Sequence, residues 1–248
     1  EQASECLARR REVNHVVNVS DTLRLLGTVE LAVGNASAAS DYFTQAAADL
    51  DEVENEQAIA LVRLDLSAVA LYQGNYAQAR ELIAQAIPVL NRSNRRDDFL
   101  RTLFQRATLN WYEGDYAAAE RDFQEALSIA HDLQASLEPD CLYWLARTTL
   151  RQGQRDSAVE WIRQSMALLL SDDKRRAKLD ALLVAFEILI KDNHLSLVGE
   201  VLELVRRDPA TDARTRREAA QMEAAVPETS GETLDPDAAI QRLLLELR

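Results

Sequence analysis

The stretch GNYAQARELIAQA, residues 74–86, is followed forty residues later by the similar stretch GDYAAAERDFQEA, residues 114–126. Each opens with a glycine and then places a small residue five positions on, a large apolar residue nine positions on and a small residue twelve positions on. Those three positions lie on one face of an α-helix. Each stretch therefore predicts a tight turn followed by a helix that packs closely through this face.

The same pattern occurs four times, with glycines 40, 40 and 39 residues apart, and a weaker fifth copy begins at Asn193. A small residue seven positions before each glycine marks a preceding helix. Two antiparallel helices need glycine where the backbone turns and small residues where their axes approach, so the repeat unit is a helix pair. The glycines are Gly34, Gly74, Gly114 and Gly153, the packing residues after them are Ala39, Ala79, Ala119 and Ala158, then Phe43, Ile83, Phe123 and Ile162, and the small residues before them are Gly27, Ser67, Ala107 and Ala146.

This pattern resembles the tetratricopeptide repeat (TPR) family, in which a small residue in the first helix is followed by a G-N/D-Y turn and A-x-x-x-F/Y-x-x-A. The match is strongest in GNYAQA and GDYAAA. The period of about 40 residues, longer than the family's usual 34, is similar to TPR domains of MalT-type bacterial regulators. The resemblance implies an all-α, right-handed superhelical solenoid of about five repeats plus terminal helices, with a concave groove lined by the first helices.

The expected organisation places five repeats over 20–207 and further segments at both ends. The last segment begins with Asp235 as N-cap and Pro236 at the first helical position, and it carries an apolar stripe of Ile240, Leu243, Leu244 and Leu247. We expect this helix to cap the solenoid by packing near residues 195–207, with occlusion of the groove or homodimerisation as alternatives. The other segments are an N-terminal helix at 1–19 that is half of a truncated repeat, an additional helix at 208–225, a linker at 226–234 and the amphipathic helix at 235–248.

Composition limits the class of protein. The chain is 47% hydrophobic, and its 7 glycines, 5 prolines and 6% aromatic residues are too few for a turn-rich β protein. A formal net charge of −13 disfavours binding to nucleic acid. No apolar run approaches the length of a membrane span, and no signal peptide is recognisable. The sequence therefore predicts a soluble, cytoplasmic helical protein with no membrane contact.

The sequence contains no recognisable catalytic constellation. His15, His131 and His194 fall in different repeats, and there is no phosphate-binding or dinucleotide-binding glycine motif. Cys6 and Cys141 lack the spacing of a metal or redox motif. We expect no catalytic residues, no cofactor and no metal, and hence no enzymatic activity.

The first helices carry the candidate binding residues, because aromatic and arginine side chains dominate binding hot spots. A row containing Leu71, Trp111 and Leu150 has an alternative explanation, since an apolar ladder at helical spacing is normally core. The predicted partner-binding groove consists of Tyr72, Arg101, Phe104, Thr108, Trp111, Tyr112, Tyr143, Arg147 and Arg151.

Three functions are compatible with the sequence. The favoured one is a non-catalytic scaffold that binds a protein or peptide segment in the groove, as part of a larger bacterial signalling or regulatory protein. The second is an effector-sensing, autoregulatory domain of a MalT-type transcription regulator. The third is a regulatory arm of an attached enzyme.

Overall fold

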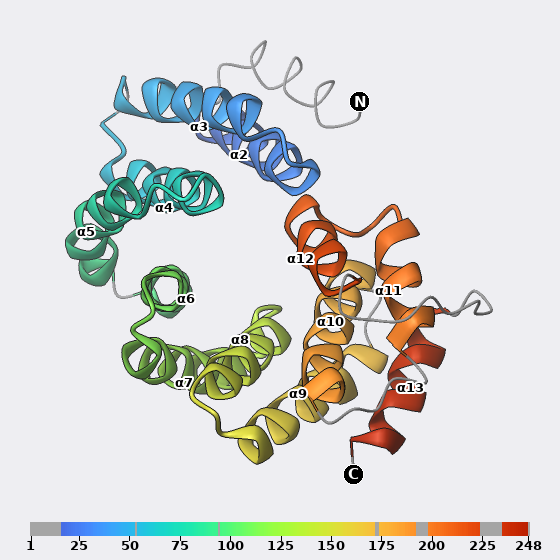
Figure 1. Cartoon of the computed structure of the whole chain (residues 1–248). Helices are drawn as coiled ribbons and strands as arrows, with labels where there is room; N and C mark the ends of the chain where they lie inside the picture. Colours follow the sequence, from blue (N-terminus) through green and yellow to red (C-terminus); the bar gives the residue numbers. More distant parts are fainter. Residues whose placement is uncertain are drawn as a thin grey trace. The chain divides into compact units, whose positions relative to one another are not determined.

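The computed structural model describes residues 16–52, 54–93, 95–171, 174–191, 198–223 and 235–247, and within these ranges it contains twelve α-helices and no strand (Figure 1). The predicted all-α class is therefore confirmed. Most of the 1–19 segment, the turn at Asn193 and the 226–234 linker lie outside the described residues. The chain divides into two compact units, Glu1–Asp115 and Tyr116–Arg248.

The first unit contains two helix pairs and one further helix, and each second helix packs on both its own partner and the next first helix. The first helix already includes Val16, whereas the sequence placed the start of the repeats at residue 20. The helices are α2 (Val16–Val33), α3 (Ala36–Asp51), α4 (Glu56–Tyr72), α5 (Tyr76–Arg92) and α6 (Arg96–Glu113).

The second unit continues the same alternation, and its last three helices are shorter than the others. Its best-defined pair is α8 with α9, and α10 packs on both α8 and α9. The helices are α7 (Tyr116–Leu133), α8 (Glu138–Arg151), α9 (Arg155–Leu170), α10 (Arg175–Lys191), α11 (Val198–Arg207), α12 (Ala213–Glu223) and α13 (Pro236–Glu246).

The glycine turns have the conformation that the repeat predicted. Gly114 has a φ of 85°, and the Asp115 N–H donates to the Asn110 carbonyl at 2.9 Å, which closes the helix end in the Schellman manner. The glycines of the other three copies also have positive φ. At the next helix start, Asn35 and Asn75 accept backbone N–H groups at 3.4 and 3.3 Å through their side chains. The turn phrase therefore both ends one helix and begins the next.

The core follows the predicted packing positions. The residues named above at the three repeated positions, from Ala39 to Ala146, are all buried. Position 27 has room only for glycine, because a Cβ there would lie 2.6 Å from the Phe43 ring. The two helices of this pair can approach closely because the small Gly27 faces the large Phe43 ring.

Polar contacts also link consecutive first helices. Arg24 Nε of α2 donates to Asp65 of α4 at 2.5 Å, and Gln57 Nε2 of α4 donates to Asp98 of α6 at 2.6 Å. Burial raises the pKa of Asp65, although Arg24 opposes this rise. The two bonds join residues about one repeat apart, so they reinforce the stacking of pair on pair.

The last helix, α13, packs mainly on α10 and α9. Ile240, Leu243 and Leu247 are buried, and Arg242 forms an ion pair with Glu200 of α11 at 3.0 Å. The sequence had favoured the 195–207 region, whereas most of the contact falls on the preceding helices. Three of the four residues of the apolar stripe are therefore buried within the chain, and Leu244 is half-buried.

Candidate binding surface

In the first unit, the predicted residues differ widely in accessibility. Arg101 is exposed, Tyr72 and Phe104 are half-buried, and Thr108 is buried with its hydroxyl donating to the Phe104 carbonyl at 2.8 Å. We call Arg101, Phe104 and Thr108 the α6 face. Its accessible part consists of the first two side chains.

Trp111 and Tyr112 take part in packing between helices. Tyr112 stacks on Tyr76 of α5 with ring centroids 5.8 Å apart, and the Trp111 ring meets it edge-on at 5.2 Å. Both aromatic residues are half-buried. The position of Trp111 is compatible with its packing alternative, and contact of Trp111 or Tyr112 with a partner stays a prediction.

In the second unit, Tyr143 and Arg147 of α8 are buried, with exposed fractions of 4% and 5%. Arg147 donates to the Tyr143 hydroxyl at 3.0 Å, and its guanidinium lies 5.1 Å from the centre of the Trp144 ring. We call Tyr143, Trp144 and Arg147 the α8 face. One arginine is thus held by two aromatic neighbours on its own helix.

The α8 face is covered by α12. Glu218 forms an ion pair with Arg147 at 3.2 Å, and the Arg214 guanidinium lies 5.4 Å from the centre of the Trp144 ring. Cation–π contacts of this length are favourable. The residues that the sequence assigned to an open groove therefore bind a helix of the same chain.

The neighbouring first helix, α10, contributes a buried carboxylate to this contact. The Thr215 hydroxyl donates to Asp180, and Arg214 lies 3.6 Å from the same carboxylate. Burial raises the pKa of Asp180 to about 6, and the positive charge of Arg214 opposes this rise. Burial also acts to raise the pKa of Asp212, but Arg214 and the hydrogen bonds from Thr215 outweigh burial and lower it.

Arg151 lies at the far end of α8 and is exposed. It forms an ion pair with Glu187 of α10 at 3.3 Å. The nine predicted residues are thus distributed over the two units, six in α4 and α6 and three in α8.

Four residues of the contact with α12 are absent from the predicted groove, namely Trp144, Asp180, Arg214 and Glu218. Trp144 follows a predicted residue directly, so its aromatic ring was a detectable signal. The three polar residues carry no motif, because only the fold brings α10 and α12 to α8.

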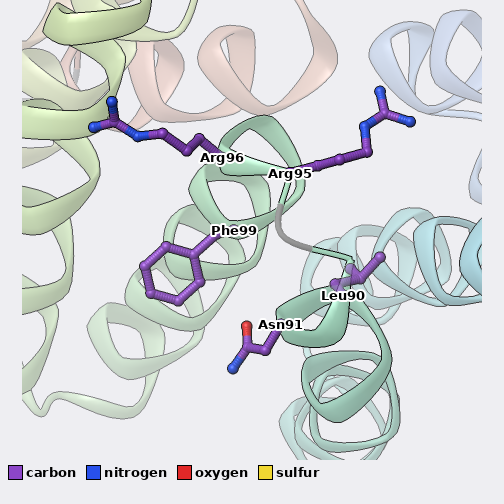
Figure 2. Close-up of a pocket in the computed structure, with 5 residues that line it drawn as sticks. All are labelled: Leu90, Asn91, Arg95, Arg96 and Phe99. Carbon is purple, nitrogen blue, oxygen red and sulfur yellow. The ribbon is translucent and has the colours of Figure 1, made fainter.

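A cavity of about 340 Å³ lies in the first unit at the turn between α5 and α6, lined by Leu90, Asn91, Arg95, Arg96 and Phe99. Figure 2 shows the Arg95 and Arg96 side chains extending in opposite directions. Two guanidinium groups that diverge do not form one anion site, so the cavity does not suggest a charged ligand.

A second cavity, of about 520 Å³, lies in the second unit between the start of α8 and the end of α9. Glu138, at its edge, accepts a hydrogen bond from the exposed His131 ring at 2.8 Å, and this bond raises the pKa of the histidine. The pair has the geometry of a helix-end contact.

Among the described residues, no three His, Cys, Asp or Glu side chains gather in a way that could bind a metal ion. Cys141 is a free, buried thiol, and burial raises its pKa. None of the helices in this part of the chain has both the length and the apolar character of a membrane span.

Comparisons with known proteins agree with the helix-pair architecture. Residues 56–132, which run from the start of α4 almost to the end of α7, match the model of the tetratricopeptide repeat family. No curated protein matches the chain in sequence.

Solved structures resemble the fold over most of the chain. One contains the TPR-like repeats of a Podosopora anserina protein described as a kinesin light chain; it is 14% identical, with a TM-score of 0.54, over 85% of this chain and 97% of the other. Another is a Rap protein complexed with competence and sporulation factor; it is 15% identical, with a TM-score of 0.66, over 96% of this chain and 68% of the other. The fold is therefore TPR-like, and such helical repeats generally serve as interaction scaffolds.

Proposed function

We propose that this chain is a non-catalytic, cytoplasmic binding module that recognises a segment of another protein through the faces of its first helices. The observation that carries this proposal is the contact of α12 with the α8 face, where Tyr143 and Arg147 lie under a polypeptide helix. These two residues occupy the repeat positions of Phe104 and Thr108 in α6. On the α6 face, the equivalent positions are Phe104, which is half-buried, and Thr108, which is buried, and Arg101 beside them is exposed.

A polypeptide fits these surfaces better than a small metabolite. The two cavities described above are lined by residues at the start of α6 and α8, and none of the residues of the α6 or α8 face lines them. Small-molecule sites are normally concave pockets that enclose most of the ligand. A half-buried aromatic ring beside an exposed arginine instead suits an extended or helical segment.

The test is selection of peptides from a displayed random library on the whole chain. Peptides enriched on the unmodified protein should bind the double variant Arg101→Ala/Phe104→Ala about tenfold or more weakly, since hot-spot truncations typically cost more than 1 kcal/mol. The matched control is Glu81→Ala/Gln85→Ala, which removes two exposed side chains of the second helix α5. Equal binding to both variants, or no enrichment of any peptide, would contradict the proposal.

A second candidate is a regulatory domain of a larger bacterial protein, in which an effector changes how α12 lies on α8. It is favoured by the polar character of the α12 contact, because weakly held elements are the ones that move in switching. Cloning and sequencing the full-length gene tests this candidate. A flanking ATPase, DNA-binding or enzyme domain is expected, and a gene that encodes no further domain would overturn it.

A further inference from the structure

The contact of α12 with the rest of its unit involves little apolar burial. Ala219 is the only buried apolar side chain among the described residues of α12, whereas α13 buries Ile240 and Leu243. Burying a large aliphatic side chain contributes about 1.5–3 kcal/mol, and a single methyl group contributes much less. Among the described helices, α12 therefore gains least from the hydrophobic effect.

Its polar contacts compensate only in part. The Glu218 side chain of the Arg147 pair and the Arg214 side chain of the Asp180 pair are both partly exposed, at 23% and 25%. Ion pairs that water reaches contribute little to stability, and burial of Asp180 opposes docking. Release of α12 consequently exposes little apolar surface of its own.

Release would, however, uncover a surface on α8 and α10 of the kind that binds proteins. Tyr143 and Arg147 are almost fully buried at present, and Asp180 is buried beside them. Trp144 contacts Arg214 of α12, while its ring also stacks on Phe123 of α7 at 5.7 Å and keeps that contact after release. Tyrosine, tryptophan and arginine are the residue types most enriched at interface hot spots. The uncovered patch would also carry one positive and one negative group.

The complementary face of α12 shows which partner this surface fits. Arg214 stacks on the aromatic rings and pairs with Asp180, Thr215 donates to Asp180, and Glu218 pairs with Arg147. Residues 214, 215 and 218 lie within one helical turn and share a face. The pattern is thus Arg, a hydroxyl residue, two unrestricted residues and Glu.

We propose that the α8 face together with Asp180 is a docking site for a helix of a partner protein that presents the pattern R-[S/T]-x-x-E, and that α12 is the internal helix which this partner displaces. The inference rests on the proposed function, since it names the partner chemistry of one binding face. We therefore expect α12 and the partner helix to compete for the α8 face, so that the partner binds more tightly once α12 is loosened.

The connection to α11 allows α12 to leave and return. Asp208 is an ion-pair partner of Arg175 on α10, and the Thr211 hydroxyl donates to the Val205 carbonyl at 2.6 Å. This connection remains bonded to α10 and α11 whether or not α12 is docked. A tethered helix competes at a high effective concentration, so an external helix needs either higher affinity or a loosened α12.

A fluorescein-labelled peptide of residues 211–223, TDARTRREAAQME, is the probe, and fluorescence anisotropy on the whole chain is the measurement. In the opened variant Arg214→Ala/Glu218→Ala, the side chains of the α8 face are unchanged, and α12 loses its contacts with them but keeps the Thr215 hydrogen bond to Asp180. We expect the peptide to bind the opened variant about tenfold or more tightly than the unmodified chain. The control is Arg217→Ala/Gln221→Ala, which changes two exposed residues of α12 and should bind the peptide like the unmodified chain.

Reversing the charges of the Arg147–Glu218 pair tests whether this pair determines which helix binds. With Arg147→Glu added to the opened variant, the unmodified peptide should lose about tenfold in affinity, and a peptide carrying Glu218→Arg should recover it. Circular dichroism melting checks folding, and Arg147→Gln with a Glu218→Gln peptide replaces the reversal if Arg147→Glu lowers the melting temperature. If the peptide binds the opened and unmodified chains equally, α12 is no more than a terminal cap. The same holds if the Glu218→Arg peptide does not recover the affinity lost with Arg147→Glu. Either result overturns this inference, while peptide selection at the α6 face tests the proposed function separately.

Discussion

Arg147 of α8 lies 3.2 Å from the carboxylate of Glu218 on α12, although three helices separate the two residues in the sequence. Both helices belong to the second unit. Arg147 also donates to the Tyr143 hydroxyl at 3.0 Å, so its buried guanidinium has a charged and a neutral partner in these two contacts. The accessibility of the α8 face therefore depends on the docking of α12.

Glu218→Gln tests how firmly α12 is held. Removing the charge should weaken docking by about 1 kcal/mol, because Arg147 loses its charged partner but keeps the Tyr143 hydroxyl. Hydrogen exchange measured by mass spectrometry should become about fivefold faster in residues 213–222, with α8 and α9 unchanged. Glu246→Gln on α13 is the control and should leave exchange in α12 unaltered.

Asp180 should make stability depend on pH. Its pKa in the folded protein, about 6, lies above the ordinary value of 3.8, so folding favours the protonated carboxyl. The free energy of unfolding should therefore fall by about 1–3 kcal/mol as pH rises from about 4 to about 6. Asp65 and Asp140 also have raised pKa values and contribute slopes of the same sign.

Urea unfolding at several pH values measures the contribution of Asp180 to the pH dependence of stability. In Asp180→Asn, the free energy of unfolding should decline less between pH 4 and pH 7, because the asparagine side chain does not ionise. Asp156→Asn changes a fully exposed side chain on α9 and should reproduce the unmodified profile. An identical profile for Asp180→Asn would show that its carboxyl titrates normally.

Ala119→Leu tests the small-residue rule of the repeat. Ala119 is fully buried on α7, so the larger side chain should overpack the contact and lower the free energy of unfolding by about 1–3 kcal/mol. Ala117→Leu, two residues away on the same helix, is exposed and should change stability by less than about 0.5 kcal/mol. Thermal melting of the two variants provides the comparison, and equal loss in both would argue against close packing at Ala119.

Gly114 tests the backbone requirement of the turn. A Cβ at this position would meet no atom within 4 Å, so any cost of substitution comes from its φ of 85°. Gly114→Val should lower stability by about 1–3 kcal/mol, while Gly114→Asn should cost clearly less, since asparagine tolerates this region. Chemical denaturation measures the difference, and equal effects of the two substitutions would count against the left-handed turn.

Leu243→Ala tests the attachment of α13. The side chain is fully buried, so truncation should lower the free energy of unfolding by about 2–4 kcal/mol or detach the helix. Leu245→Ala removes a side chain of the same size that is 59% exposed and should have little effect. Light scattering on both variants tests homodimerisation through this helix. A dimer that depends on Leu243 or Leu245 would dissociate in the variant that lacks that side chain.

The sequence alone predicted the repeated architecture, because its causes are local. The helical period places Ala79, Ile83 and Ala86 on one face whatever surrounds them, and all three are buried. Gly74 has the positive φ that its turn requires, and Asn75 caps the helix that follows. The turn, the cap and the packing face all lie within about fifteen residues, so the sequence of each copy is enough to predict its local structure.

Only the tertiary structure decided which first-helix faces remain open. Tyr143 and Phe104 occupy the same repeat position, yet one is buried under α12 and the other is half-buried. The difference arises from Arg214 and Glu218, which come from a helix outside the glycine repeat and carry no motif. Coverage by a distant segment depends on how helices stack in space, and a helical period measured along the chain does not contain that information.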